Sequence, residues 1–179
     1  MLKTSKYLYF IFLFLINAVS WLIVHLAVSK LIGNMEVRNI NRLSILFKTY
    51  PFERKGQLWN DVFKIKRWKA HIPESTSIMP DSFDQSRMKD TDLKTVSQFI
   101  DETNRAELTH WASILPVPLF FIWNPKYTRG IHLSYALLSN MPFIIAQRYN
   151  RPRLRRMYRL KCRNENRHKK EHDDYEKEN

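Results

Sequence analysis

Two apolar regions, one at the start of the chain and one in its second half, dominate the pattern of hydrophobic and polar positions. The first, Tyr7 to Val28, carries no Asp, Glu, Lys or Arg, and it has the roughly 20 residues that a helix needs to cross a bilayer. It therefore predicts a transmembrane helix. A cleaved signal peptide is the alternative, because Ala18-Val19-Ser20 resembles a cleavage site. The apolar run continues well past that site, which favours a membrane anchor.

The second region consists of two shorter apolar stretches, Ala112 to Trp123 and Ile131 to Ala146, each containing proline. The polar segment 124–130 predicts a turn between them. Two arrangements are open: two crossings with polar-flanked extensions, or a re-entrant hairpin whose backbone is satisfied inside the protein. We favour two crossings.

The region between the apolar runs mixes basic and aromatic residues, which suits either a membrane interface or an ordinary helical surface. From Thr91 the pattern becomes helical, with Asp90 or Thr91 available as the N-cap and Asp92 in the first turn. This amphipathic helix runs into the second apolar region.

The pattern as a whole predicts a mainly α membrane protein. Its expected parts are an N-terminal transmembrane anchor (1–30), a central interfacial helical region (31–111), a pair of short proline-containing hydrophobic helices (112–147) and a basic cytoplasmic tail (148–179). The last part of that tail, Arg163 to Asn179, has almost no apolar residue and is expected to be disordered.

The charge distribution changes the picture that the average composition gives. The 179 residues are 44% hydrophobic and 26% charged, with a formal net charge of +13. The two kinds of residue are segregated, and many of the cations follow directly after the second apolar region. Lys and Arg beside a membrane segment indicate the cytoplasmic face, so the central region and the tail are both predicted to be cytoplasmic. The membrane segments argue against nucleic acid as the partner.

Several kinds of chemistry find no support in the residues. Cys162 is the only cysteine, which excludes a disulfide framework, a multi-thiolate zinc site and a redox pair within the chain. The sequence has no GxSxG, HExxH, Walker A or GxGxxG pattern. We therefore expect no cofactor.

The strongest candidate for catalysis is a polar pair, Glu107 and His110, on the apolar face of the amphipathic helix. Their spacing makes them neighbours on one helical face, and a buried charge must be compensated or used. One interpretation is a general base, His110, supported by Glu107, which removes a proton from a hydroxyl group that attacks an acyl carbonyl. A structural tie between helices is the equal alternative. A di-iron site would need a second such pair and two more glutamates, so no metal is predicted.

A second set of candidates lies where a helix is expected to leave the bilayer. Gln147, Arg148, Asn150 and Arg151 are placed to hold the phosphates of an acyl donor, since arginine binds phosphate bidentately. A stop signal facing anionic lipid is the alternative. Further candidates for substrate or donor binding are Arg105, Trp68 and Lys69, of which Trp68 and Lys69 are also readily explained as interfacial anchors.

Four motifs follow one another from about Phe47 to about Arg156: KIKRWKAHIPES, ETNRAELTHWASILPV, the Asn124-Pro125 turn and NMPFIIAQRYNRPRL. With these motifs in this order, the chain resembles the glycosyl-4,4'-diaponeurosporenoate acyltransferase family. The resemblance implies a cell-membrane enzyme that transfers a fatty acyl chain to the 6-hydroxyl of the sugar on a glycosylated carotenoid such as glycosyl-4,4'-diaponeurosporenoate, in staphyloxanthin-type pigment biosynthesis. The family pattern also includes Asn140 and Pro142.

The implied partners are a glycosylated carotenoid acceptor, membrane lipids and a fatty acyl donor. The donor is left open among coenzyme A, a carrier protein and a lipid. The alternative to the enzyme is a non-catalytic lipid-binding or scaffold protein of a pigment pathway, which would not need His110.

Overall fold

The computed structural model describes residues 2–68 and 92–178. Within these ranges all regular structure is helical, which confirms the predicted fold class in its coarse form. The elements are α1 (Leu2–Gly33), α2 (Val37–Arg42), η1 (Pro51–Gly56), α3 (Gln57–Phe63), α4 (Ile65–Trp68), α6 (Leu93–Ile114), η3 (Val117–Phe121), η4 (Lys126–Thr128) and α7 (Arg129–Glu178).

The chain divides into two compact units, and each is described by itself. The first unit comprises Met1–Ile40 and Arg105–Ile144, and the second comprises Asn41–Asn104 and Ile145–Asn179. The helices α6 and α7 each contribute residues to both units.

The first unit is built on α1, which is long and apolar enough over Tyr7–Gly33 to cross a membrane. Most of its large apolar side chains are exposed. A small core forms where Trp21 packs with Val117, Phe120 and Ala136, and the Trp21 and Phe120 rings stack with centroids 4.2 Å apart. The turn between α6 and α7, which contains η3 and η4, is thus fixed against α1.

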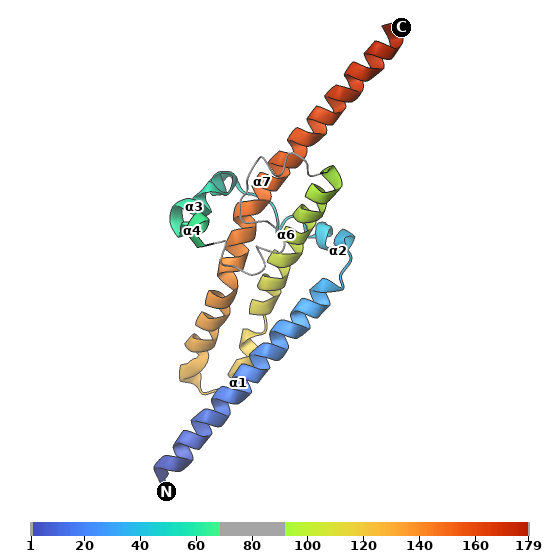
Figure 1. Ribbon diagram of the computed structural model, residues 1–179. Helices are drawn as coiled ribbons and strands as arrows, with labels where there is room; N and C mark the ends of the chain where they lie inside the picture. The colour runs from blue at the N-terminus through green and yellow to red at the C-terminus, as the bar shows by residue number, and fades with distance from the viewer. Residues whose placement is uncertain (1, 69–91, 179) are drawn as a thin grey trace. The chain divides into compact units, whose positions relative to one another are not determined.

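The predicted turn between the two apolar stretches is present, and polar contacts attach it to the middle of α1. Asn17 and Asn124 exchange two hydrogen bonds of 2.8 Å each, and the indole of Trp123 donates to Asn17 Oδ1 at 3.0 Å. The N-terminal part of α1 extends beyond this turn (Figure 1). Within the described residues, α1 is the only helix that is long and apolar enough to span a bilayer.

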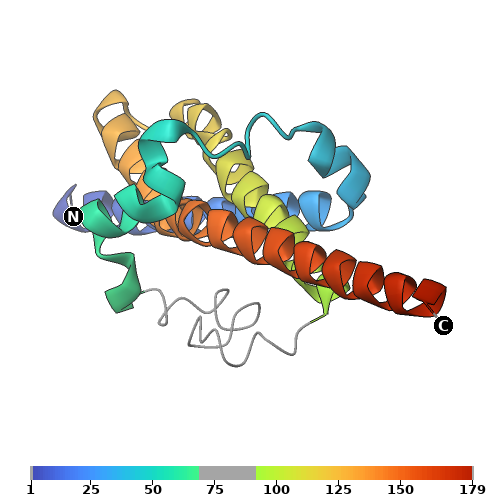
Figure 2. The ribbon, with the colours of Figure 1, turned by 90° about the horizontal axis from the view of Figure 1, so that it is seen from above.

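The second unit packs the segment before α3 against the middle of α7. Gly56 sits so close to α7 that a Cβ atom there would lie 2.9 Å from the carbonyl oxygen of Tyr149. Its φ of +88° is also in the left-handed region, where glycine is favoured. Figures 1 and 2 both show α3 beside α7.

Two features of α6 differ from the expected amphipathic helix. Asp92 is the cap itself, because its Oδ1 accepts the backbone N–H of Thr95 at 3.3 Å. Hydrogen bonds from the side chain and the backbone of Thr95 lower the pKa of the Asp92 carboxyl group; Asp90 and Thr91 lie outside the described residues. Asn104 is buried and donates to Asn41 at 3.2 Å. Polar residues of α6 therefore also make contacts within the protein.

The end of the chain is helical where disorder is expected from its composition. Residues 163–178 continue α7, and the side chains of 163–177 are exposed. The segment is rich in Lys, Arg and Glu, which are good helix formers. Oppositely charged neighbours such as His172 and Glu176, 3.6 Å apart at i, i+4 spacing, add to that tendency.

Candidate functional site

In the first unit the imidazole of His110, the main candidate for catalysis, lies beside the amide of Asn140. His110 is only 9% exposed and Asn140 only 1%, and His110 Nδ1 lies 2.9 Å from Asn140 Oδ1. The imidazole ring also stacks on Phe143, with centroids 4.4 Å apart and an interplanar angle of 8°. These contacts hold the ring in one orientation.

The hydrogen bonds of Asn140 assign the tautomer of His110. Asn140 Nδ2 donates to the carbonyl of Ala136 at 2.9 Å, so the amide nitrogen faces its own helix and the oxygen faces the imidazole. An amide oxygen only accepts, and Nδ1 of His110 must therefore carry the hydrogen. In the neutral imidazole the basic nitrogen is then Nε2.

Glu107 lies on the same helix as His110 and is fully buried, as the sequence pattern predicts. Its Oε1 accepts a hydrogen bond from the indole of Trp111 at 3.2 Å. The two side chains are neighbours on α6, at i, i+3 spacing.

Arg105 belongs to the first unit and caps α1. Its guanidinium donates to the carbonyl oxygens of Ile32, Gly33 and Met35 at 2.7, 2.9 and 2.9 Å. A cation at the C-terminal end of a helix satisfies its last carbonyl groups and complements the helix dipole. Arg105 therefore has a clear structural task.

In the second unit Arg148 and Arg151 are held by the chain's own groups. Arg148 forms an ion pair with Glu53 at 3.1 Å and donates to the carbonyl of Leu46 at 2.7 Å. Arg151 is 2% exposed; it donates to the hydroxyl and the carbonyl of Thr103 at 3.2 and 2.8 Å. The structure thus gives both guanidinium groups structural partners, and donor binding by them stays a prediction.

The remaining candidates of the second unit are also largely inside the protein. Gln147 and Asn150 are buried, and within the described residues no group hydrogen-bonds to Asn150 Oδ1. Trp68 donates its indole N–H to the carbonyl of Phe63 at 2.7 Å, which caps the end of α3. Lys69 lies outside the described residues.

Two important partners were not among the candidates from the sequence. Asn140 entered only through the family pattern, although Asn140, Gln147 and Arg151 recur at the spacing of one helical face. Glu53 gave no such signal. It is 1% exposed and accepts from Arg148, from the Trp59 indole at 3.1 Å and from the Tyr50 backbone at 2.7 Å.

Comparison with known proteins gives a consistent result. The model of a family described as glycosyl-4,4'-diaponeurosporenoate acyltransferase matches residues 44–160. Two relatives with that name, from Staphylococcus aureus strains MRSA252 and USA300, are each 37% identical over 148 residues, covering 83% of this chain and 89% of the relative. No solved structure gives a significant match. The resemblance seen in the sequence is thereby confirmed: the chain belongs to the glycosyl-4,4'-diaponeurosporenoate acyltransferase family and is an acyltransferase.

Proposed function

We propose that this protein transfers a fatty acyl chain to the sugar 6-hydroxyl of a glycosylated carotenoid at the cell membrane, with His110 as the general base. The name of the relatives supports the acceptor. The observation that carries the mechanism is the contact of His110 Nδ1 with Asn140 Oδ1, because it leaves Nε2 as the basic atom.

The chemical step needs a base at the attacking oxygen. The sugar hydroxyl attacks the acyl carbonyl carbon while Nε2 of His110 takes its proton. The tetrahedral intermediate then collapses, the bond to the donor's leaving group breaks, and the imidazolium returns the proton to that group. The new ester and the protonated leaving group balance the reaction.

Asn140 and Glu107 have separate supporting tasks in this mechanism. Asn140 positions the ring and fixes its tautomer, as the third member of a catalytic triad does. Glu107 stabilises the imidazolium that forms when the proton is taken, since a buried carboxylate acts in a medium of low dielectric constant. Neither residue has to exchange a proton itself.

The surface of the first unit supports a position in the lipid. Large apolar side chains of α1 and of the start of α7 are exposed, among them Phe14 at 71% and Leu138 at 76%. Monomeric soluble proteins rarely expose such extended apolar patches. An acceptor with a long polyene would be in the same phase as this unit, and its sugar would lie toward the headgroups.

We infer that the turn between α6 and α7 re-enters the membrane without crossing it. The turn is held at Asn17, which is about 24 Å along α1 from Gly33 at 1.5 Å per residue. The apolar, exposed part of α1 continues beyond this point to Tyr7, so the turn reaches less far than α1 does. Burying the side chains of 7–16 in lipid gains on the order of 15 kcal/mol. Holding the turn's cations Lys126 and Arg129 at depth costs only about 6 kcal/mol. The balance favours a hairpin that ends inside the bilayer.

A re-entrant hairpin and two full crossings predict the same orientation of the chain in the membrane. In either case the central region and the tail from Arg148 onward lie on the same face, and the excess of Lys and Arg places that face in the cytoplasm. The acyl donor is then taken from the cytoplasmic side.

The function is tested by mass spectrometry of pigments from a host that makes the glycosylated carotenoid, with and without this chain. We expect an acylated product only with the chain. A precursor whose sugar lacks the 6-hydroxyl should give none. An acylated product from that precursor would overturn the assigned position, and no acylated product from either precursor, with the protein abundant, would overturn the acceptor.

A further inference from the structure

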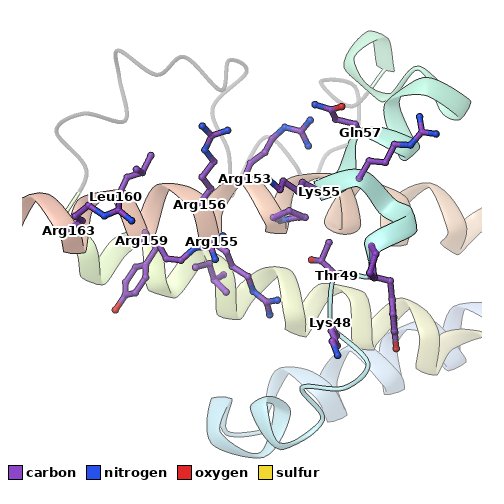
Figure 3. Close-up of a pocket in the computed structure, with 16 residues that line it drawn as sticks. Lys48, Thr49, Lys55, Gln57, Arg153, Arg155, Arg156, Arg159, Leu160 and Arg163 are labelled. Carbon is purple, nitrogen blue, oxygen red and sulfur yellow. The ribbon is translucent and has the colours of Figure 1, made fainter.

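A cavity of about 1260 Å³ opens in the second unit, and the positive charge of its lining sets it apart. Its described lining contains Lys and Arg at eight positions and no carboxylate. One wall is the segment before α3, which supplies Lys48, Arg54 and Lys55. This wall and the opposite one on α7 are drawn in Figure 3.

The opposite wall is a basic stripe on α7. Arg156, Arg159 and Arg163 follow one another at i, i+3 and i+7, which places them on one face of the helix. All three are exposed. Figure 3 shows them along the helix, with Arg153 and Arg155 nearer to the first wall.

The cations of the lining fall into two groups. Arg153 and Arg155 are bound to the protein: Arg153 lies over the ring of Tyr149, with its guanidinium carbon 3.5 Å from the ring centroid, and Arg155 donates to the carbonyl of Phe47 at 3.3 Å. Burial lowers the pKa of Arg153, yet a guanidinium stays charged at neutral pH.

The side chains of the other six cations make no hydrogen bond or ion pair to any residue that the structure describes, and all six are exposed. They are Lys48, Arg54, Lys55, Arg156, Arg159 and Arg163. Two of them, Arg54 and Lys55, also have positive φ angles of 48° and 57°. Like charges gathered around a hollow repel one another and create a potential that attracts anions. Strained backbone tends to persist at ligand sites. The unpaired charges indicate a site for a ligand with several negative charges, and the strained backbone supports the presence of a ligand site here.

We propose that this cavity binds the phosphates of a coenzyme A thioester, which is the acyl donor of the reaction. The identification of the ligand as a donor rests on the proposed acyl transfer. Coenzyme A carries several phosphate groups, whereas the prosthetic group of a carrier protein and a simple phospholipid each carry one, so the number of cations fits coenzyme A best. The arginine forks bind phosphate oxygens bidentately.

The size and the uncharged part of the lining fit the rest of the same molecule. Pockets for small ligands measure about 300–1,000 Å³, so this cavity has room for a nucleotide with its phosphates. Tyr50 and Tyr158 line it together with Ile100. Aromatic and aliphatic side chains of this kind offer surfaces on which a base such as adenine packs.

The test is the affinity for coenzyme A of the full-length protein in nanodiscs of phosphatidylcholine, measured by calorimetry. The variant Arg156→Gln/Arg159→Gln removes two charges from the cavity. The variant Lys169→Gln/Lys170→Gln removes two charges from the same helix outside the cavity and is the control. We expect a loss of affinity of about tenfold or more in the first and little change in the second, since a hydrogen bond to a charged group is worth about that factor.

Further arms separate the possible sources of phosphate. Dephospho-coenzyme A should bind more weakly than coenzyme A, and added salt should weaken both. The proposal is wrong if coenzyme A does not bind, if both double variants lose affinity equally, or if vesicles of phosphatidylglycerol bind at the cavity while coenzyme A does not compete. The variant His110→Gln should bind coenzyme A normally. Binding therefore tests the donor site separately from the proposed base, which only the acylation reaction tests.

Discussion

Asn17 on α1 and Asn124 in the turn before α7 form a reciprocal amide pair, in which each side chain donates to the other at 2.8 Å. Asn124 also donates to the carbonyl of Phe120 at 2.9 Å. Polar groups in a membrane segment are costly unless they are satisfied internally. This pair therefore fixes the depth of the turn along α1.

Replacing either asparagine with Leu should weaken the first unit, because the remaining amide loses its partner in a site that is buried at Asn124 and half-buried at Asn17. Interactions of this kind in membrane proteins average about 0.6 kcal/mol and reach about 1.7. We expect Asn17→Leu and Asn124→Leu to lower the free energy of unfolding by amounts in that range. In a double-mutant cycle by unfolding in detergent, the two losses should be less than additive. Full additivity would mean that the pair is not a coupled contact.

The re-entrant turn can be distinguished from two crossings by labelling. In a Cys162→Ser background, a cysteine at Tyr127, which is 71% exposed in the turn, should resist a membrane-impermeant maleimide added to intact cells. A cysteine at Lys3, before the first apolar run, should react from outside. Equal labelling of the two positions would establish two full crossings instead.

The ion pair of Glu53 and Arg148 should contribute strongly to the stability of the second unit. Breaking a buried ion pair costs about 3–5 kcal/mol because one charge is left uncompensated, and the side-chain exposures here are 1% for Glu53 and 15% for Arg148. We expect Glu53→Gln to lower the free energy of unfolding by about 3 kcal/mol in chemical denaturation. The same substitution at the exposed Glu36 is the control and should cost little. Equal losses of unfolding free energy in the two variants would show that the ion pair contributes no more to stability than an exposed glutamate does.

Gly56 should tolerate no side chain. Its left-handed φ is strained for Ala. A Cβ atom would also lie only 2.9 Å from the Tyr149 carbonyl oxygen, which is too close. We expect Gly56→Ala to lower the midpoint of thermal unfolding by several degrees. Gly130 is a matched control, since nothing lies within 4 Å of its Cβ position, and there Ala should be neutral or stabilising. A midpoint for Gly56→Ala at or above that of the wild type would contradict the close packing.

The helices of this protein could be predicted from the sequence because their signals are local. The apolar run of α1 and the amphipathic pattern of α6 each lie within one segment. The buried positions of Glu107 and His110 also follow from helical spacing. The helical end of α7 does not follow from the sequence, because its composition resembles that of disordered segments as well as that of solvated helices.

The partners of the site residues could not be predicted, since they join segments far apart in the chain. Glu53 meets Arg148 from 95 positions away, and Thr103 meets Arg151 from 48. No periodicity links such residues. The sequence therefore indicated two arginines for phosphate binding, and only the structure revealed that their guanidinium groups are occupied and that other cations surround a cavity.

Acylation by the His110→Gln variant tests the central claim most directly. Glutamine keeps the polarity and approximate size of the side chain but cannot accept and return a proton, and a positioned general base contributes about 10²- to 10⁴-fold. His132→Gln makes the same change at another buried histidine of the first unit and is the control. With both variants inserted and abundant, we predict that His110→Gln loses acylated carotenoid within that range while His132→Gln stays near the wild type. Near-normal acylation by His110→Gln would contradict the assignment and leave His110 as a structural contact of Asn140.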